Sequence, residues 1–174
     1  MKPAIVLILA IANNGVIGTT DPSNHIPWRL PRDTKFFRDN TTGDGNNTVL
    51  MGRKTWDTIP PKYRPLPNRK NIVLSRSTAS VHADVTVFQS MEEVLKYLES
   101  ADHPIIFIAG GLEIYRQFLP HAHTILITRV DADVKGDVIF DDLDLSGWRR
   151  STTERHEADD KNEHAMIFER YIRR

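Results

Sequence analysis

The chain has 174 residues, with 23 Lys and Arg and 23 Asp and Glu, so its formal net charge is zero. Its content of 40% hydrophobic and 26% charged residues is typical of one globular domain and excludes a disordered or collagen-like chain. The balanced charge gives no basic excess of the kind that a dedicated nucleic-acid binder carries, and the lack of cysteine excludes disulfides, thiolate metal sites and a cysteine nucleophile.

The first predicted element is an apolar run over residues 4–12. Short apolar runs of this length are typical of a buried strand. A secretory signal is the alternative, because Ala10-Ile11-Ala12 is similar to a cleavage site, but the run is short and its charged start is weak. No stretch is long enough to span a membrane. We therefore expect a single domain over residues 1–174, located in the cytoplasm, with no membrane and no nucleic-acid partner.

Apolar runs alternate with helical patterns along the chain, which indicates an α/β fold. The predicted strands are Ala4–Ala12, Thr48–Met51, Asn71–Ser75, Val85–Phe88, Ile105–Ala109 and Thr124–Val130. The runs Ile5–Ala12 and Ile105–Ala109 lack polar alternation, so we expect them at the centre of a mostly parallel sheet. The segments Trp148–His156 and His164–Tyr171 flank the polar segment Glu157–Glu163 and predict an antiparallel hairpin at the sheet edge.

Three helices are predicted between the strands. Ser90 and Glu93 have the spacing of a capping box, and apolar residues continue from there at helical spacing. A second helix is expected to follow Gly110-Gly111 and to end before Pro120, and a third to cover Arg32–Asn40. The segment from 13 to 31 has no clear periodicity, and connections of this length are often functional lids. Residues 60–67 form another irregular, proline-rich segment.

Asp33 is the leading candidate for chemistry in the predicted third helix. Taken alone, it is more simply explained as a first-turn carboxylate that interacts favourably with the helix dipole. Its neighbours Trp28, Leu30, Phe36 and Phe37 would form an apolar wall, and such a wall disfavours the charged form of an acid. A carboxylate held in that environment is a good receptor for the paired N–H donors of an amidine-like group.

Two glycine-containing turns each follow a predicted strand and open a predicted helix. The segment Met51-Gly52-Arg53-Lys54-Thr55-Trp56 combines the N–H groups of a helix start with two cations, which is a pattern that binds phosphate. Gly110-Gly111 lets a ligand approach the backbone closely. Neither segment matches a Walker A loop or the dinucleotide fingerprint, so a solvated basic turn and a tight packing turn remain alternatives. Arg53, Lys54 and Arg76 together would suit a ribose 2′-phosphate.

Histidine gives no comparable pattern. His121 and His123 lie near a predicted helix end, and no third ligand accompanies them, so we predict no metal site. No nucleophile elbow is visible either.

Several motifs in one order make the chain resemble the dihydrofolate reductase family over nearly its whole length. They are Ile8-Leu9-Ala10, Gly15-Val16-Ile17-Gly18, Ile26-Pro27-Trp28-Arg29-Leu30-Pro31-Arg32-Asp33, Met51-Gly52-Arg53-Lys54-Thr55-Trp56, Arg64-Pro65-Leu66-Pro67-Asn68-Arg69, Leu74-Ser75-Arg76, Gly110-Gly111 with Ile114-Tyr115, and Thr128-Arg129-Val130-Asp131. The resemblance implies an eight-stranded, mostly parallel sheet with flanking helices. It also implies NADPH-dependent reduction of dihydrofolate to tetrahydrofolate, by hydride transfer to C6 and protonation at N5.

The same resemblance implies roles in catalysis and substrate binding. Asp33, Thr128, Trp28 and Tyr115 would form the catalytic set, with Asp33 binding the ring N–H and 2-amino group of the pterin and Thr128 supporting that pairing. The substrate-binding set would be Ile8, Asp33, Thr34, Phe37, Ile59, Leu66, Arg69, Ala109 and Thr128. Arg69 would pair with the glutamate carboxylate of folate. Diaminopyrimidine antifolates are the inhibitors expected to bind, and a monomer is the expected state.

The cofactor-binding set implied by the resemblance is larger. It consists of Ala10, Ile17, Gly18, Gly52, Arg53, Lys54, Thr55, Leu74, Ser75, Arg76, Gln89, Ala109, Gly110, Gly111, Leu112, Glu113, Ile114 and Tyr115. Gly110 and Gly111 match a pair joined by a cis peptide in the family, and Tyr115 matches a hydroxyl near the nicotinamide.

The chain departs from the family pattern at a few positions. The loop from Gly18 to Trp28 is longer than in compact bacterial members, with Ile26 where some members have Met. Thr34 replaces a common apolar ligand contact, and Ala109 is smaller than the usual branched residue. Two other functions stay open, namely a related NADPH-dependent reductase of pterin or pyrimidine precursors and a non-catalytic nucleotide-binding module.

Overall fold

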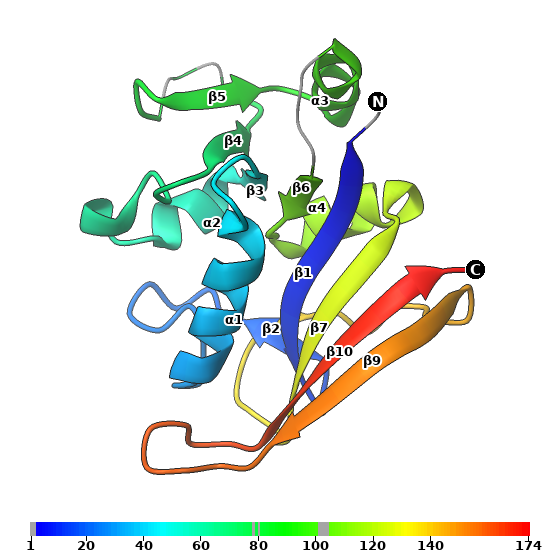
Figure 1. Cartoon of the computed structure of the whole chain (residues 1–174). Coiled ribbons are helices and arrows are strands. Elements are labelled where there is room, and N and C mark those ends of the chain that lie inside the picture. The colour runs from blue at the N-terminus through cyan, green and yellow to red at the C-terminus, as the bar shows by residue number, and fades with distance from the viewer. Residues whose placement is uncertain (1–2, 78, 80, 101–104) are drawn as a thin grey trace. The chain divides into compact units, whose positions relative to one another are not determined.

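Eight strands form one sheet in the order β5-β4-β3-β6-β1-β7-β10-β9 in this computed structural model, which describes residues 3–77, 79, 81–100 and 105–174 (Figure 1). The strands are β1 (Ala4–Ala12), β3 (Thr48–Gly52), β4 (Lys70–Leu74), β5 (Val85–Phe88), β6 (Ile105–Ile108), β7 (Thr124–Val130), β9 (Trp148–His156) and β10 (Met166–Arg173), and a separate pair consists of β2 (Val16–Gly18) and β8 (Val138–Ile139). The predicted α/β class, the hairpin and the central place of the two unalternated apolar runs are confirmed, since β6 and β1 are neighbours in mid-sheet.

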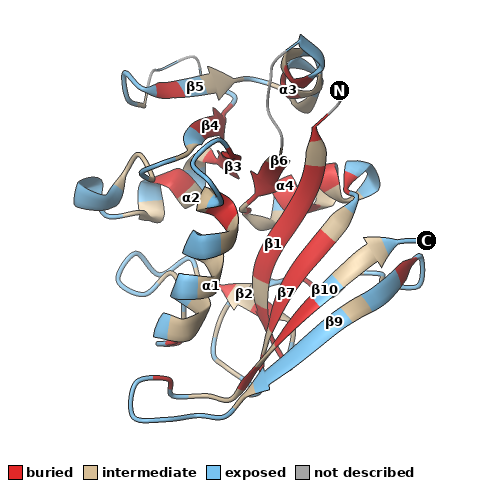
Figure 2. Cartoon of the chain, viewed as in Figure 1, coloured by how far each residue is buried: buried red, intermediate tan, exposed pale blue. Residues whose placement is uncertain are grey.

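The chain divides into two compact units, Met1–Leu7 with Asp39–Ala122 and Ile8–Arg38 with His123–Arg174. In the first unit all strand pairs are parallel, and every residue of β3 is buried (Figure 2). A parallel strand covered on both faces needs a continuous apolar run, which is what this part of the sequence provides. That residues 1–174 form a single domain stays a prediction.

In the second unit β10 pairs antiparallel with both β7 and β9. Strand β9 is exposed along most of its length, and it carries arginine and threonine side chains (Figure 2). Polar and charged side chains on an edge strand discourage pairing with another sheet.

Glu169 on β10 is a buried charge in this unit, with 6% of its side chain exposed. It accepts hydrogen bonds from Arg129 Nε at 3.1 Å, Arg150 Nη1 at 2.8 Å and the Tyr171 hydroxyl at 3.0 Å. Desolvation acts to raise the pKa of Glu169, but these hydrogen bonds outweigh it and lower the pKa. The carboxylate therefore stays charged and ties β7, β9 and β10 together.

The helices are α1 (Pro31–Thr42), α2 (Arg53–Thr58), α3 (Met91–Ser100) and α4 (Leu112–Phe118), with short 3-10 turns at Pro61–Tyr63 and Leu119–His121. The capping box predicted for α3 is present, because Glu93 N–H donates to Ser90 Oγ at 3.2 Å and Gln89 N–H donates to Glu93 Oε2 at 2.8 Å. Helix α1 begins one residue before its predicted start and ends two residues after its predicted end.

The prediction of an unstructured segment over residues 13–31 is wrong in one place. Residues Val16–Gly18 form β2, which pairs with the two-residue strand Val138–Ile139. Neither strand is long enough for its alternation to stand out, and the partners lie about 120 positions apart in sequence. No helix within the described residues has the length and apolar character needed to cross a membrane.

Candidate functional site

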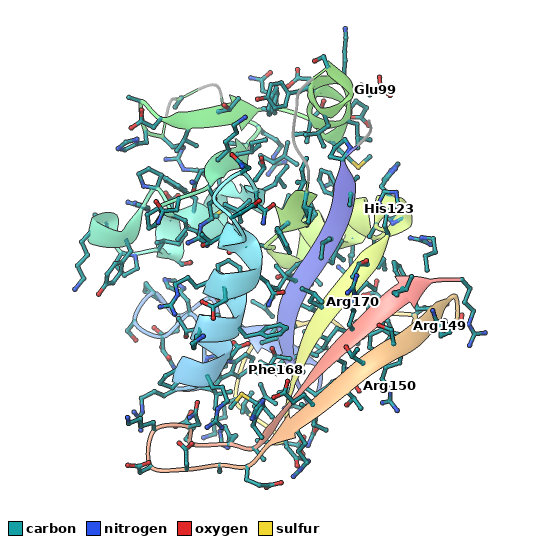
Figure 3. All side chains as sticks on the ribbon, in the orientation of Figure 1. Glu99, His123, Arg149, Arg150, Phe168 and Arg170 are labelled. Carbon is teal, nitrogen blue, oxygen red and sulfur yellow. The ribbon has the colours of Figure 1, made fainter. Side chains whose placement is uncertain are left out.

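Asp33 lies in the first turn of α1, beside an apolar cluster. Trp28 and Leu30 are buried members of that cluster, and Phe36, one turn after Asp33, packs against it. The Phe36 ring stacks on Phe168 of β10 with ring centroids 4.1 Å apart and planes 9° apart (Phe168 is labelled in Figure 3). The stack holds the face of α1 that carries Asp33 against the sheet.

The Asp33 carboxyl group has one polar side-chain partner in the second unit, the buried hydroxyl of Thr128 on β7. Burial raises the pKa of Asp33 above its ordinary value, and the hydrogen bond from Thr128 opposes that rise without cancelling it. The simple first-turn interpretation from the sequence is therefore insufficient, since an exposed carboxylate at a helix start has no reason for a raised pKa. A desolvated carboxyl group with unused acceptor capacity suits a ligand that brings N–H donors.

The Trp28 indole adds a donor to the same apolar cluster. Among the side chains that the structure describes, Trp28 Nε1 is buried without a hydrogen-bond partner. A buried N–H without an acceptor costs about 1–3 kcal/mol, so this group favours a bound molecule that offers an oxygen.

The start of α1 has its own hydrogen bonds. Thr34 N–H donates to the Leu30 carbonyl at 3.1 Å, which is the first helical bond of α1. The Thr34 side chain is exposed, and its hydroxyl donates to the same carbonyl at 3.4 Å. Phe37 is half-buried. Ile8, also in this unit, is buried in β1.

In the first unit the two glycine turns meet. Gly52 N–H donates to the Gly110 carbonyl at 2.8 Å, and Ala109 N–H donates to the Leu50 carbonyl at 2.8 Å. The Gly110-Gly111 peptide bond is cis, and Gly110 has φ of +99°. A Cβ at Gly110 would lie 2.9 Å from the ring of Tyr115, so a side chain there would displace the tyrosine.

A side chain at Gly52 or at Gly111 would also crowd its neighbours. A Cβ on Gly52 would lie 3.0 Å from Ile114, and one on Gly111 would lie 3.3 Å from the Thr55 hydroxyl. Tyr115 N–H donates to the Gly111 carbonyl at 2.9 Å and so starts α4 directly at the turn. The backbone at the ends of β3 and β6 is thus brought together without intervening side chains.

The predicted phosphate-binding cations lie at the ends of elements of the first unit. Arg53 opens α2 and its Nε bonds to Asp57 at 3.0 Å, while Lys54 and Arg76 are exposed. Ser75 is buried after β4, where its N–H donates to the Phe88 carbonyl at 2.9 Å and its hydroxyl accepts from Ser77 N–H at 3.2 Å. The geometry leaves the ends of the Lys54 and Arg76 side chains accessible to an anion.

The loop that carries Leu66 and Arg69 is shaped by Asn71, a buried residue of β4 that the sequence analysis did not single out. The Asn71 side chain accepts from Leu66 N–H at 3.0 Å and donates to the carbonyls of Leu66 at 2.9 Å and Arg69 at 3.0 Å. The Arg69 guanidinium in turn donates to Pro67 O at 2.8 Å and to the Thr41 hydroxyl. In the sequence Asn71 is only the first residue of a predicted strand, and no pattern around it indicates that its side chain shapes the preceding loop.

The long loop after β2 is anchored by Asp137, another residue that the sequence analysis missed. Its carboxylate accepts from Thr20 N–H at 2.7 Å and from the Thr20 hydroxyl, and these bonds lower the pKa of Asp137. Within the loop, Thr19 N–H donates to the His25 carbonyl at 2.9 Å and the Thr19 hydroxyl to the Asn24 carbonyl at 2.8 Å. The longer loop is therefore held in shape by hydrogen bonds within it and to Asp137.

The remaining predicted residues lie as follows, with Ile17 and Gly18 on a strand that the sequence did not predict. The second unit holds Ala10 on β1 and Ile17 and Gly18 on β2, and the first unit holds Ile59 after α2, Leu74 on β4, Gln89 before α3, and Leu112, Glu113 and Ile114 on α4. Glu113 pairs with Arg116 at 3.0 Å, an ordinary contact along one helix. Among the described residues no group of three or more potential metal ligands occurs.

Comparisons with known proteins agree on one family. The family model described as dihydrofolate reductase matches residues 4–173. Relatives named dihydrofolate reductase from Haemophilus influenzae and Bacillus subtilis are 38% and 34% identical over 93% and 96% of this chain, which correspond to 94% and 93% of theirs. A solved structure of dihydrofolate reductase from Enterococcus faecalis, complexed with NADP(H) and RAB-propyl, has a TM-score of 0.87 and 32% identity, covering 99% of this chain and 98% of that one.

The raised pKa of Asp33 predicts that its charge destabilises the unliganded fold. Below the unfolded value of 3.8 the group is protonated in both states, and as pH rises above that value the folded state loses stability because ionisation is disfavoured there. The variant Asp33→Asn should therefore resist urea more than the parent chain at neutral pH, with a difference that shrinks below about pH 4. Urea unfolding at both pH values measures this, and equal or lower stability of the variant at neutral pH would contradict the desolvation of the charge.

Proposed function

The chain belongs to the dihydrofolate reductase family, whose members use NADPH to reduce dihydrofolate to tetrahydrofolate, and we propose that Asp33 and Thr128 bind the pterin ring in this reaction. The observation that carries the proposal is the half-buried Asp33 side chain beside the apolar cluster, where desolvation raises the pKa of its carboxyl group and a hydrogen bond from Thr128 opposes that rise. A related reductase acting on other pterins or pyrimidines would share the cofactor, but none of the residues described in the structure favours it over dihydrofolate.

Asp33 contributes electrostatics and orientation. Its two carboxylate oxygens match the ring N–H and 2-amino group of a pterin, as they match the amidine-like edge of a diaminopyrimidine antifolate. A negative charge at this edge favours the protonated pterin, which is the form that accepts a hydride at C6 more readily. Thr128 supplies a hydrogen bond to the Asp33 carboxyl group. The unpartnered Trp28 indole N–H is suited to an oxygen of the substrate or of a water molecule beside it.

The first unit supplies the residues suited to NADPH. The cofactor, when bound, supplies the hydride. The glycines at positions 52, 110 and 111 leave the backbone open to close approach, and Arg53, Lys54 and Arg76 carry the positive charge that phosphates require. Tyr115 sits against Gly110, where its ring limits the space beside the turn. These features fit a phosphorylated dinucleotide better than an uncharged ligand.

The glutamate tail and the rings of the substrate are matched to side chains of complementary chemistry. Arg69 is the cation for the glutamate carboxylate of folate, and its guanidinium is oriented by Thr41 and by the loop that Asn71 shapes. The apolar side chains of Ile8, Phe37, Ile59 and Leu66 would contact the rings of the substrate, and Ala109 offers a small side chain and a backbone carbonyl. A monomeric state and a cytoplasmic location stay predictions.

Replacing the charge of Asp33 is the direct test of its role. We expect Asp33→Asn to slow the hydride step at neutral pH by on the order of 10²–10⁴-fold, because the variant cannot stabilise the protonated pterin. The step is measured by single-turnover oxidation of NADPH with dihydrofolate in the presence of saturating cofactor. Asp39→Asn, the same chemical change further along α1 on an exposed side chain, is the control and should keep the parent rate. A near-normal rate in Asp33→Asn would refute the assignment.

The exposed cations test the cofactor proposal. Loss of one charged contact to the 2′-phosphate costs about 1.5–3 kcal/mol, so Arg76→Ala should weaken NADPH binding on the order of 10–100-fold and leave NADH binding within about a factor of three. Arg53→Ala should act in the same direction but less, because its guanidinium also pairs with Asp57. Arg149→Ala on the exposed strand β9 removes the same charge and serves as the control (Arg149 is labelled in Figure 3). Equal weakening of both cofactors would place the 2′-phosphate elsewhere.

A further inference from the structure

We infer that Asn162 and Asp159, in the loop between β9 and β10, are positioning residues that hold the first turn of α1 through Arg32 and thereby place the Asp33 carboxyl group. The inference rests on the role proposed for Asp33. All four residues belong to the same compact unit, Ile8–Arg38 with His123–Arg174. The connection between β9 and β10 extends beneath the start of α1 in Figure 1, and hydrogen bonds join the two segments.

The first turn of α1 lacks a local cap. Leu30 accepts the first helical bond and so occupies the N-cap position, but a leucine side chain has no oxygen to accept the free N–H groups of the turn. Arg32 N–H is one of these groups, and it donates to Asn162 Oδ1 at 3.0 Å. Asn162 thus performs from 130 positions away the function that a Ser, Thr or Asp at the N-cap usually performs.

The buried position of Asn162 requires an amide side chain there. Asn162 has 4% exposure, although its neighbours Lys161 and Glu163 are exposed. Its Oδ1 accepts from Arg32 N–H, and its Nδ2 donates to Asp159 Oδ1 at 2.9 Å. Only one orientation of the amide satisfies both contacts, because one partner is a donor and the other an acceptor. Neither a carboxylate nor an apolar side chain can replace it without leaving a buried polar group unpaired.

Asp159 fixes both the cap and the Arg32 side chain. Its Oδ1 also accepts from Lys161 N–H at 2.9 Å and Asn162 N–H at 2.7 Å, and its Oδ2 bonds to Arg32 Nη2 at 3.0 Å. Hydrogen bonds from Asn162 and Lys161 together with the charge of Arg32 lower the pKa of Asp159 to about 2. The Asp159 carboxylate therefore stays ionised at neutral pH. Arg32, Asp159 and Asn162 together are called the clamp.

The distant cap leaves Asp33 available for the site. Asp33 stands at the third helical position, where an acidic side chain commonly turns back to bond the N-cap N–H. In this chain the Asp33 carboxyl group bonds Thr128 instead, and Asn162 satisfies a free donor of the helix start. If the clamp is removed, the first turn gains freedom and the bond from Thr128 to Asp33 should weaken. Further contacts join the same two segments: Arg29 N–H donates to the Glu163 carboxylate at 2.6 Å, and the Arg29 and Arg32 guanidinium groups donate to the backbone carbonyls of Asp160 and Glu157. His164 lies 3.7 Å from the Glu163 carboxylate.

The test removes the cap and reads out Asp33. In Asn162→Ala we expect the single-turnover hydride rate to fall by about tenfold or more and the KM for dihydrofolate to rise, with the affinity for NADPH unchanged. The pKa of the Asp33 carboxyl group, followed by carbon NMR in the free enzyme, should rise further, because the Thr128 hydrogen bond holds it down. A general loss of stability would not move this pKa in the folded molecules. Lys161→Ala, an exposed neighbour, is the matched control.

A double substitution tests the hydrogen-bond pairing itself. Asn162→Asp keeps an acceptor for Arg32 N–H but opposes the charge of Asp159, so we expect it to impair the hydride step. Adding Asp159→Asn restores a donor and acceptor between the two positions and should recover part of the rate, so that the double variant exceeds Asn162→Asp alone. If Asn162→Ala does not fold, Asp159→Asn alone carries the test, with an expected effect of about threefold in the same direction.

The outcomes separate this inference from the proposed function. Hydride rates and Asp33 pKa values that match the Lys161→Ala control in both Asn162→Ala and Asp159→Asn would overturn the inference while leaving the role of Asp33 intact. A normal hydride rate in Asp33→Asn would instead refute the proposed function. The NMR titration of Asp33 would still decide whether the clamp positions that carboxyl group, because it needs no turnover.

Discussion

The desolvation of one carboxyl group is the constraint on which the second unit depends. Placing Asp33 beside Trp28 and Leu30 raises its pKa, so the site holds a group whose charge the unliganded fold disfavours. In the proposed function this cost is compensated when N–H donors of a pterin pair with the carboxylate, which would favour binding and protonation of the ligand together. Thr128 and the stack of Phe36 on Phe168 limit how far the carboxyl group can turn away.

The role proposed for the first unit makes a different demand, which is the close approach of a large anionic ligand to the backbone. Side chains are absent at the glycines where β3 and β6 end, and the Gly52 to Gly110 hydrogen bond fixes the two turns against each other. Lys54 and Arg76 carry positive charge on exposed side chains. In the proposed function, cofactor binding rests on backbone shape and exposed cations, while the chemistry of the pterin rests on the partly desolvated Asp33 carboxyl group.

The sequence predicts much of this fold because its strongest signals are local. The central strands are apolar on both faces, the capping box of Ser90 and Glu93 is contiguous, and the wall around Asp33 lies within a few residues of it. The partners of Thr20 and Arg32 could not be predicted, because Asp137 and Asn162 lie more than 100 positions away in polar segments that look like solvent-exposed loops. Thr128 was assigned from resemblance to the family, since a threonine in an apolar strand gives no sign of its partner.

The most direct measurement is a crystal structure of the enzyme with folate and NADP⁺ both bound. The account predicts that both carboxylate oxygens of Asp33 lie within hydrogen-bond distance, roughly 2.7–3.2 Å, of the ring nitrogen and 2-amino group of the pterin, with the Thr128 hydroxyl still bonded to the carboxylate. A carboxyl group of Asp33 that points to bulk solvent in that complex would contradict the account.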